Sequence, residues 1–123
     1  MKGESFMAEK VYKYDAYDEV HNIVLGKTSY RNNNTLAVLM IEVFDDGAEE
    51  DWATLTVNID DSKVFANHES KAFVDINNLQ RTIINWLAVN GIAYVTGVIG
   101  YSGYCKYPLV EFTKKALDGM RRY

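Results

Sequence analysis

The fold is decided by one stretch, residues 35–59, which reads TLAVLMIEVFDDGAEEDWATLTVNI. Its first ten residues are apolar at nearly every position, as in a central strand that is covered on both faces. Its last eight residues alternate strictly: one face carries Ala53, Leu55, Val57 and Ile59, and the other carries Trp52, Thr54, Thr56 and Asn58. The DDG turn signal between the two runs predicts that they pair as antiparallel strands.

The segments around this pair add strands and helices. Residues 20–30 predict an earlier strand, which the turn-forming RNNN at 31–34 ends, and AFV at 72–74 predicts a short later one. Residues 75–78 can cap a helix. One apolar helical stripe follows, made of Leu79, Ile83, Trp86 and Leu87. Asn90-Gly91 is typical of the end of that helix.

The last segments complete the expected fold. Residues 109–112 predict a closing strand, and residues 113–120 predict a short terminal helix. The sequence therefore predicts an α+β fold: a mainly antiparallel sheet of four to six strands, with one packed helix and a short C-terminal helix.

Length and composition predict one domain. The chain has 123 residues, 48% of them hydrophobic, which is enough for a core without disulfide or metal staples. Residues 1–10 lack periodicity and are expected to form a flexible leader, and residues 11–123 to form the single α+β domain. The one cysteine forms no internal disulfide, and no run of 18 apolar residues or signal peptide is present. These features favour a cytoplasmic protein without membrane contact.

Charge is divided unevenly along the chain. Residues 1–62 hold five Lys or Arg against thirteen Asp or Glu, a net of −8, whereas residues 63–123 hold eight against four, a net of +4. The densest acidic run comprises Asp45, Asp46, Glu49, Glu50 and Asp51. This run is either a solvated hairpin loop or a contact for a basic protein groove. The basic residues near the C-terminus, which allow a contact with RNA, are Lys114, Lys115, Arg121 and Arg122.

Residues 94–109 have the most unusual composition. They read YVTGVIGYSGYCKYPL and hold three glycines, four tyrosines, the only cysteine and the only proline. This composition predicts a shaped loop. Tyr101, Tyr104 and Tyr107 recur at every third position and are expected to share a face. Tyrosine is enriched at protein interfaces, so these three are candidate binding residues; the alternative is that they wedge the loop against the sheet.

Signs of catalysis are few. The two histidines, His21 and His68, have no metal-binding spacing, and Cys105 has no family signature of a nucleophile. The glycines at 97, 100 and 103 match neither a phosphate loop nor a dinucleotide fingerprint. The sequence therefore predicts no catalytic residue, no metal and no cofactor.

Four segments together carry a resemblance to a known family. They are NNNTLAVLMIE, DWATLTVNID, AFVDINN with a following helix that ends in NG, and TGVIGYSGYCKYPL. In that order they resemble a small domain family of unknown function carried by conjugative elements, plasmids and phages of Firmicutes, over residues 30–112. Val98-Ile99 stands where that family would have a more polar pair. Relatives resemble the products of genes that lie beside antirestriction genes, and this resemblance implies a counter-defence role. It carries over no catalytic residues.

Two hypotheses follow. The first is a mobile-element accessory protein, a non-enzymatic inhibitor of host defence of the anti-CRISPR or antirestriction type, which acts by protein binding. Its partner would be a host defence protein or a ribonucleoprotein such as a CRISPR effector. The alternative is a small hydrolase or nucleic-acid-modifying enzyme that uses Cys105 or His68.

Overall fold

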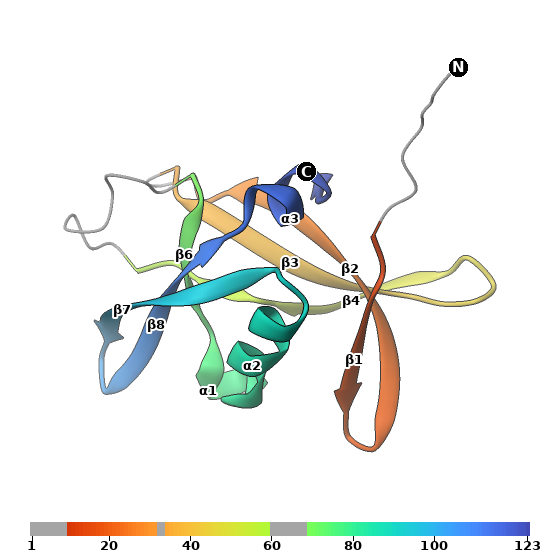
Figure 1. Cartoon of the computed structure of the whole chain (residues 1–123), viewed down its shortest axis with the longest axis horizontal. Coiled ribbons are helices and arrows are strands. Elements are labelled where there is room, and N and C mark those ends of the chain that lie inside the picture. The colour runs from red at the N-terminus through yellow and green to blue at the C-terminus, as the bar shows by residue number, and fades with distance from the viewer. Residues whose placement is uncertain (1–9, 32–33, 60–68) are drawn as a thin grey trace.

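A computed structural model describes residues 10–31, 34–59 and 69–123 (Figure 1). The elements in chain order are β1 (Tyr12–Ala16), β2 (Glu19–Ser29), β3 (Leu36–Val43), β4 (Glu49–Thr54), β5 (Thr56–Val57), β6 (Lys71–Val74), α1 (Ile76–Leu79), α2 (Thr82–Val89), β7 (Ala93–Ser102), β8 (Cys105–Phe112), α3 (Lys114–Asp118) and β9 (Arg121–Arg122). The predicted α+β class with mainly antiparallel strands is confirmed. The predicted leader lies outside the described residues except for Lys10.

The strands form two sheets. The first has the order β1-β2-β3-β4, with β9 parallel to β2, and the second has the order β5-β6-β8-β7. The antiparallel pair predicted across the DDG turn is β3 with β4. The predicted strand at 52–59 is wrong in one respect, because it breaks at Leu55. This fully buried residue donates its backbone N–H to the Val38 carbonyl, and the chain passes there from the first sheet to the second.

The core is built from both sheets and the helices. Its large, fully buried members are Ile23, Val38, Met40, Leu55, Val74, Ile83, Leu87, Ile92 and Val110. They belong to strands of both sheets, to α2 and to the segments between elements. Residues distant in sequence therefore share one interior, as expected of one domain.

The predicted helix is two helices. Asp75 caps α1 by accepting from the Asn78 backbone N–H, and Gln80 then ends α1 with φ +72, outside helical geometry. The apolar stripe is confirmed at Leu79, Ile83 and Leu87, which are buried. Trp86 is only half-buried, and its ring serves to hold β1, a strand that the sequence analysis missed.

The glycine-rich run is a β-hairpin and not a loop, which corrects the prediction. Strands β7 and β8 pair from Ala93↔Phe112 to Ser102↔Cys105, with a two-residue turn at the tip. Gly103 opens that turn with φ +62, as two-residue hairpin turns require. Gly100 allows the Phe73 ring to lie against β7, because a Cβ there would come within 2.5 Å of the ring. Gly100 and Gly103 therefore allow the packing and the tight turn that this pair of strands needs.

The C-terminal helix is confirmed in a shorter form. Thr113 caps α3 by accepting from the Ala116 backbone N–H, and β9 follows as an unpredicted strand. None of the helices in the described parts of the chain has the length and apolar character needed to span a membrane.

Candidate functional site

Strand β7 is an edge strand with an apolar exposed surface. Its sequence, AYVTGVIGYS, contains no charged residue and no proline. Among the described strands, β8 pairs with one edge of β7 and none pairs with the other. Its exposed side chains include Tyr94, Val95, Val98, Ile99 and Tyr101. Soluble proteins usually protect such an edge with charges, proline or a covering element, so this strand is the first candidate for a contact surface.

An irregular bulge divides β7. Register shifts between Val95 and Ile99, so three residues of β7 face one residue of β8. Thr96 stabilises the bulge: its hydroxyl donates to the Leu109 carbonyl at 3.0 Å and accepts from the Val98 backbone N–H at 3.2 Å. Gly97 has φ +94, which a side chain rarely allows. The bulge therefore has its own hydrogen bonds and resets the direction of the outer half of the strand.

An apolar pocket of about 530 Å³ lies between the outer half of this hairpin and the helices. Its lining residues are Ile76, Arg81, Ile84, Ile99, Lys106 and Pro108. Because Ile99 pairs with Pro108 and Tyr101 with Lys106, these four side chains lie on one face of the hairpin. The Asn77 side chain donates to the Lys106 carbonyl at 3.4 Å and links α1 to β8. Ile99 therefore lines the pocket and also belongs to the strand with the free edge.

The three predicted tyrosines do not share a face. Tyr101 is 63% exposed on the pocket face, and Tyr104 is fully exposed in the turn. Tyr107 pairs with Gly100, so it points to the opposite face, where it is half-buried. Partial desolvation and the neighbouring Cys105 thiol raise the pKa of the Tyr107 hydroxyl. Side chains alternate between the two faces of a strand, so tyrosines that were expected to share one face in a loop lie on different faces of the hairpin.

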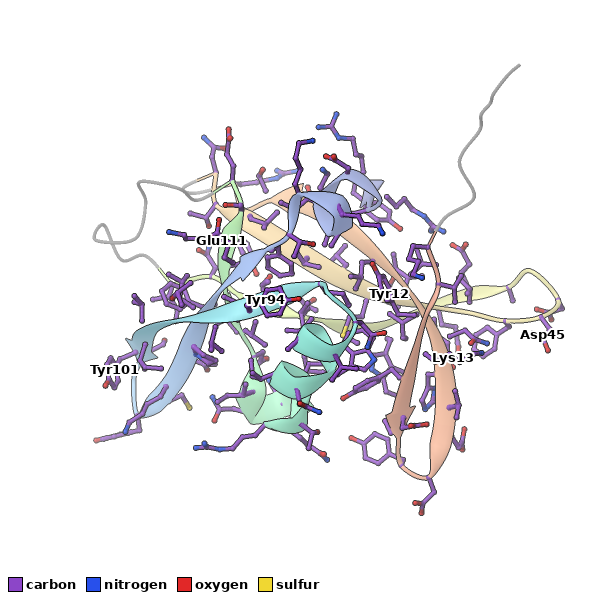
Figure 2. The ribbon with its side chains drawn as sticks, viewed as in Figure 1. Tyr12, Lys13, Asp45, Tyr94, Tyr101 and Glu111 are labelled. Atoms are coloured by element: carbon purple, nitrogen blue, oxygen red, sulfur yellow. The ribbon has the colours of Figure 1, made fainter. Side chains whose placement is uncertain are left out.

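The acidic run and the tyrosines lie at opposite ends of the molecule. Figure 2 shows Asp45 at the tip of the β3–β4 hairpin and Tyr101 near the tip of the β7–β8 hairpin. The predicted acidic loop is shorter than expected, because residues 49–51 belong to β4. Asp46 accepts from the Ala48 backbone N–H at 2.9 Å within the turn. A single small partner surface therefore cannot contact both predicted regions.

Half of the predicted basic residues pair within the chain. Arg121 forms a bidentate ion pair with Glu49, with N–O distances of 2.8 and 2.9 Å. Lys114 pairs with Asp118 at 2.7 Å, four residues later in the same helix. The hydrogen bond from Arg121 lowers the pKa of Glu49. The acidic first half and basic second half of the sequence are thus joined at Glu49.

Of the residues with potential chemistry, His21 and Cys105 lie in different sheets. His21 is buried in the first sheet, where its Nδ1 lies 2.7 Å from Glu42 Oε2 and its ring lies against Trp52 with centroids 4.1 Å apart. Cys105 begins β8 in the second sheet, beside the hairpin turn, and His68 lies outside the described residues. In the described ranges, no three His, Cys, Asp or Glu side chains gather as a metal site.

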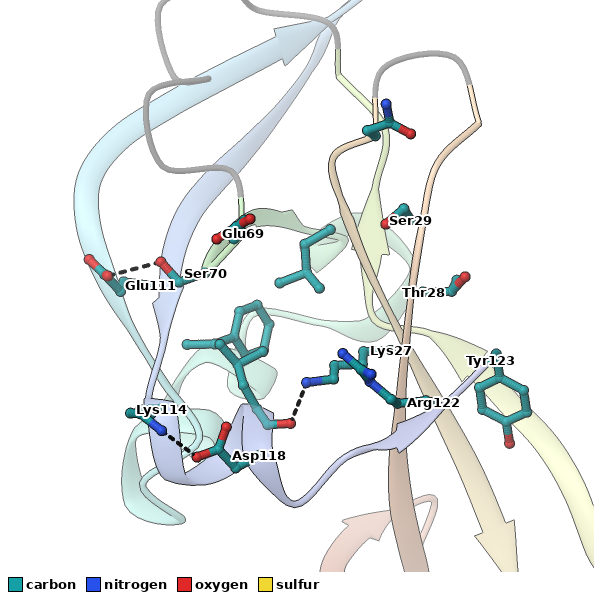
Figure 3. Close-up of a pocket in the computed structure, with 14 residues that line it drawn as sticks. Lys27, Thr28, Ser29, Glu69, Ser70, Glu111, Lys114, Asp118, Arg122 and Tyr123 are labelled. Carbon is teal, nitrogen blue, oxygen red and sulfur yellow. Dashed lines mark hydrogen bonds and ion pairs between the residues drawn. The ribbon is translucent and has the colours of Figure 1, made fainter.

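A larger polar groove of about 1120 Å³ opens between the sheets and α3 (Figure 3). Lys27 donates to the Leu117 carbonyl at 2.8 Å, Ser70 donates to Glu111 at 3.1 Å, and the Lys114 ion pair lies at its margin. Of the six charged side chains that line this groove, Lys27, Glu111, Lys114 and Asp118 have partners within the chain. Because most of its charged groups already have partners, the groove is a weaker candidate for a binding site than the apolar pocket.

Tyr101 and Tyr104, which the sequence singles out as candidate binding residues, lie on the candidate surface, whereas Val98, Ile99 and the pocket were not among the predicted residues. The sequence offered one hint, the apolar pair Val98-Ile99, at a position where the resemblance had implied a more polar pair. Pocket residues from α1 and α2 carry no signal, because only the fold brings Ile76, Arg81 and Ile84 to the hairpin.

Comparison with known proteins places the chain in a family without assigning an activity. Residues 24–123 match the model of a family described as Domain of unknown function (DUF4313), so the chain belongs to that family. No curated protein and no solved structure matches. The expected membership of a domain family of unknown function is confirmed, over a longer range than residues 30–112.

Proposed function

We propose that this member of the DUF4313 family is a non-enzymatic protein-binding module that docks through the free edge of β7. Its partner is a host defence protein or a ribonucleoprotein such as a CRISPR effector, and binding inhibits that partner by covering a surface it needs. The mobile-element and counter-defence part of the proposal comes from the family resemblance in the sequence.

One observation supports the binding mode: a ten-residue edge strand without a single charge exposes Val95, Val98, Ile99 and Tyr101. An exposed edge offers unpaired backbone N–H and C=O groups to a partner strand, and the flanking side chains give specificity. Tyr104 at the tip adds an aromatic contact with a hydroxyl that stays hydrogen-bonded in an interface. The edge and the tip together form one continuous surface of the hairpin.

The test is a plaque assay in a host with an intact CRISPR or restriction system. Expression of the parent protein should raise the plating efficiency of a targeted phage. Val98→Lys places a charge on the edge and should lower the plating efficiency at least tenfold. Tyr104→Ala should lower it by a similar factor if the tip is an anchor that contributes about 2 kcal/mol to binding. Val20→Lys is the matched control, because Val20 is an exposed valine in the other sheet.

Each contrary result has a defined meaning. If the parent protein protects phage against no defence system, the counter-defence role is wrong. If Val98→Lys and Tyr104→Ala both retain full protection, binding does not use this hairpin. If Cys105→Ser alone removes protection in a folded protein, the enzyme alternative replaces the binding module.

A further inference from the structure

We infer that the apolar pocket beside β7 receives aliphatic side chains from an extended acidic segment of the partner, which adds to β7 as a strand. This inference rests on the proposed docking at the β7 edge and names the chemistry of the docked segment. It has three supports: the composition of the pocket, the charges at its rim, and its position next to the free edge.

The pocket is built for apolar atoms. Ile76 and Ile84 form the helix side, and Ile99 and Pro108 form the hairpin side. Its volume of about 530 Å³ lies within the range of roughly 300–1,000 Å³ that ligand sites occupy. Ile99 is 43% exposed, so covering the pocket removes apolar surface from water. An aliphatic side chain is the occupant that this lining favours.

The rim of the pocket is basic. Arg81 and Lys106 contribute the charged groups, and no acidic residue belongs to its described lining. Neither cation forms an ion pair within the described ranges, in contrast to Lys114 and Arg121. Carboxylates that flank the docked aliphatic side chains would complement both cations. The segment is therefore acidic.

The position of Ile99 links the pocket to strand addition. Ile99 lies in β7, and side chains of an added strand alternate between the two faces of the sheet. Every second side chain of that strand would lie on the face that carries Ile99 and Tyr101, beside the pocket. The docked segment should thus carry aliphatic residues at alternate positions, with acidic residues nearby.

A second copy of this chain is a poorer occupant. Strand β7 has no acidic residue to offer, and two copies paired edge to edge through β7 would bring two sets of Arg81 and Lys106 toward each other. Like charges in an interface oppose association. The charge pattern therefore favours a foreign acidic segment over self-pairing.

The test uses two fluorescein-labelled ten-residue peptides and the full chain. Both peptides carry alternating isoleucine and threonine, flanked in one by glutamates and in the other by lysines. Fluorescence anisotropy should give at least tenfold tighter binding of the glutamate peptide, and the preference should weaken at high salt. The double variant Arg81→Glu/Lys106→Glu should reverse the preference, whereas Lys115→Glu, an exposed charge on α3, should leave it unchanged.

The strand-addition step has its own control. Proline in place of the central threonine should abolish binding of the glutamate peptide, because proline removes a backbone donor. Equal affinity for both peptides, or no binding of either, overturns the inference. A β7-dependent homodimer seen by sedimentation, lost in Val98→Lys, also overturns it by identifying a second copy as the occupant.

The plaque assay separates this inference from the proposed function. If Val98→Lys abolishes phage protection but Arg81→Glu/Lys106→Glu does not, and the peptides show no charge preference, docking at β7 stands and the acidic segment is wrong. If the parent protein gives no protection while the peptide preference holds, the binding site stands and the counter-defence role is wrong.

Discussion

Replacing Trp86 with alanine should remove the contact between β1 and α2 and leave β1 held by its pairing with β2. The Trp86 Nε1–H donates to the Lys13 carbonyl at 2.7 Å, and its ring meets Tyr12 and Tyr14 edge-on with centroids 6.0 and 5.0 Å apart. The hydrogen bond contributes about 1 kcal/mol, and each aromatic pair about 0.5–1.5 kcal/mol beyond its buried area. Because the ring is half-buried, we expect a loss of about 3 kcal/mol, at the low end for Trp→Ala.

Two assays apply, both followed by circular dichroism: urea unfolding gives the free energy of unfolding, and a thermal melt gives Tm. For a chain of this length, a loss of about 3 kcal/mol corresponds to a fall of about 10 °C in Tm. Trp86→Phe should cost only about 1 kcal/mol, since it keeps most of the ring and loses the donor. Val89→Ala in the same helix is the control, because Val89 is exposed. A free energy of unfolding within 0.5 kcal/mol of the parent for Trp86→Ala, a threshold typical of surface changes, would refute this account of β1.

The other predictions concern the hairpin and the charges. Gly100→Ala should destabilise the fold by about 1–3 kcal/mol, because its Cβ would meet the Phe73 ring, and Phe73→Leu in the same chain should recover part of that loss in urea titrations. The hydrogen bond from Arg121 lowers the pKa of Glu49 below its ordinary value of 4.5, so this carboxylate stabilises the fold above that pH. The Tm difference between the parent and Glu49→Gln should therefore vanish as pH falls through the lowered pKa, and a constant difference would contradict the ion pair. Asp45→Lys, which keeps the Asp46 hydrogen bond within the β3–β4 turn, should leave Tm unchanged and, if the acidic end steers binding, slow association in stopped-flow measurements.

The sequence predicted the elements whose pattern is local. Residues 36–43 form the expected strand because apolar side chains are buried on both of its faces, including Val38 and Ile41. The DDG turn was predicted correctly, and so were three of the four residues of the helical stripe, since each pattern depends on the chemistry of neighbouring residues. Two errors share one cause. The alternation at 52–59 and the glycines at 97–103 are patterns whose outcome depends on the partner strands, which are distant in sequence.

The candidate site was predicted in part for the same reason. Tyr101 and Tyr104 stood out by residue type, because tyrosine among glycines is unusual in any context. Their relation to Tyr107 required the strand register, which places Tyr101 and Tyr107 on opposite faces. The pocket required the packing of α1 and α2 against the hairpin, which brings Ile76 and Ile84 beside Ile99.

The class of the fold, its main strands and the residue types available for contact follow from local patterns, since hydrophobic period and turn chemistry act over a few residues. Which strand edge and which cations remain unpaired, among the residues that the structure describes, depends on long-range packing. It pairs Arg121 with Glu49 across 72 positions and leaves β7 at the edge of its sheet. Strand edges and ion pairs depend on how segments distant in sequence pack together. Burial of the shared hydrophobic core supplies the free energy that holds those segments in place.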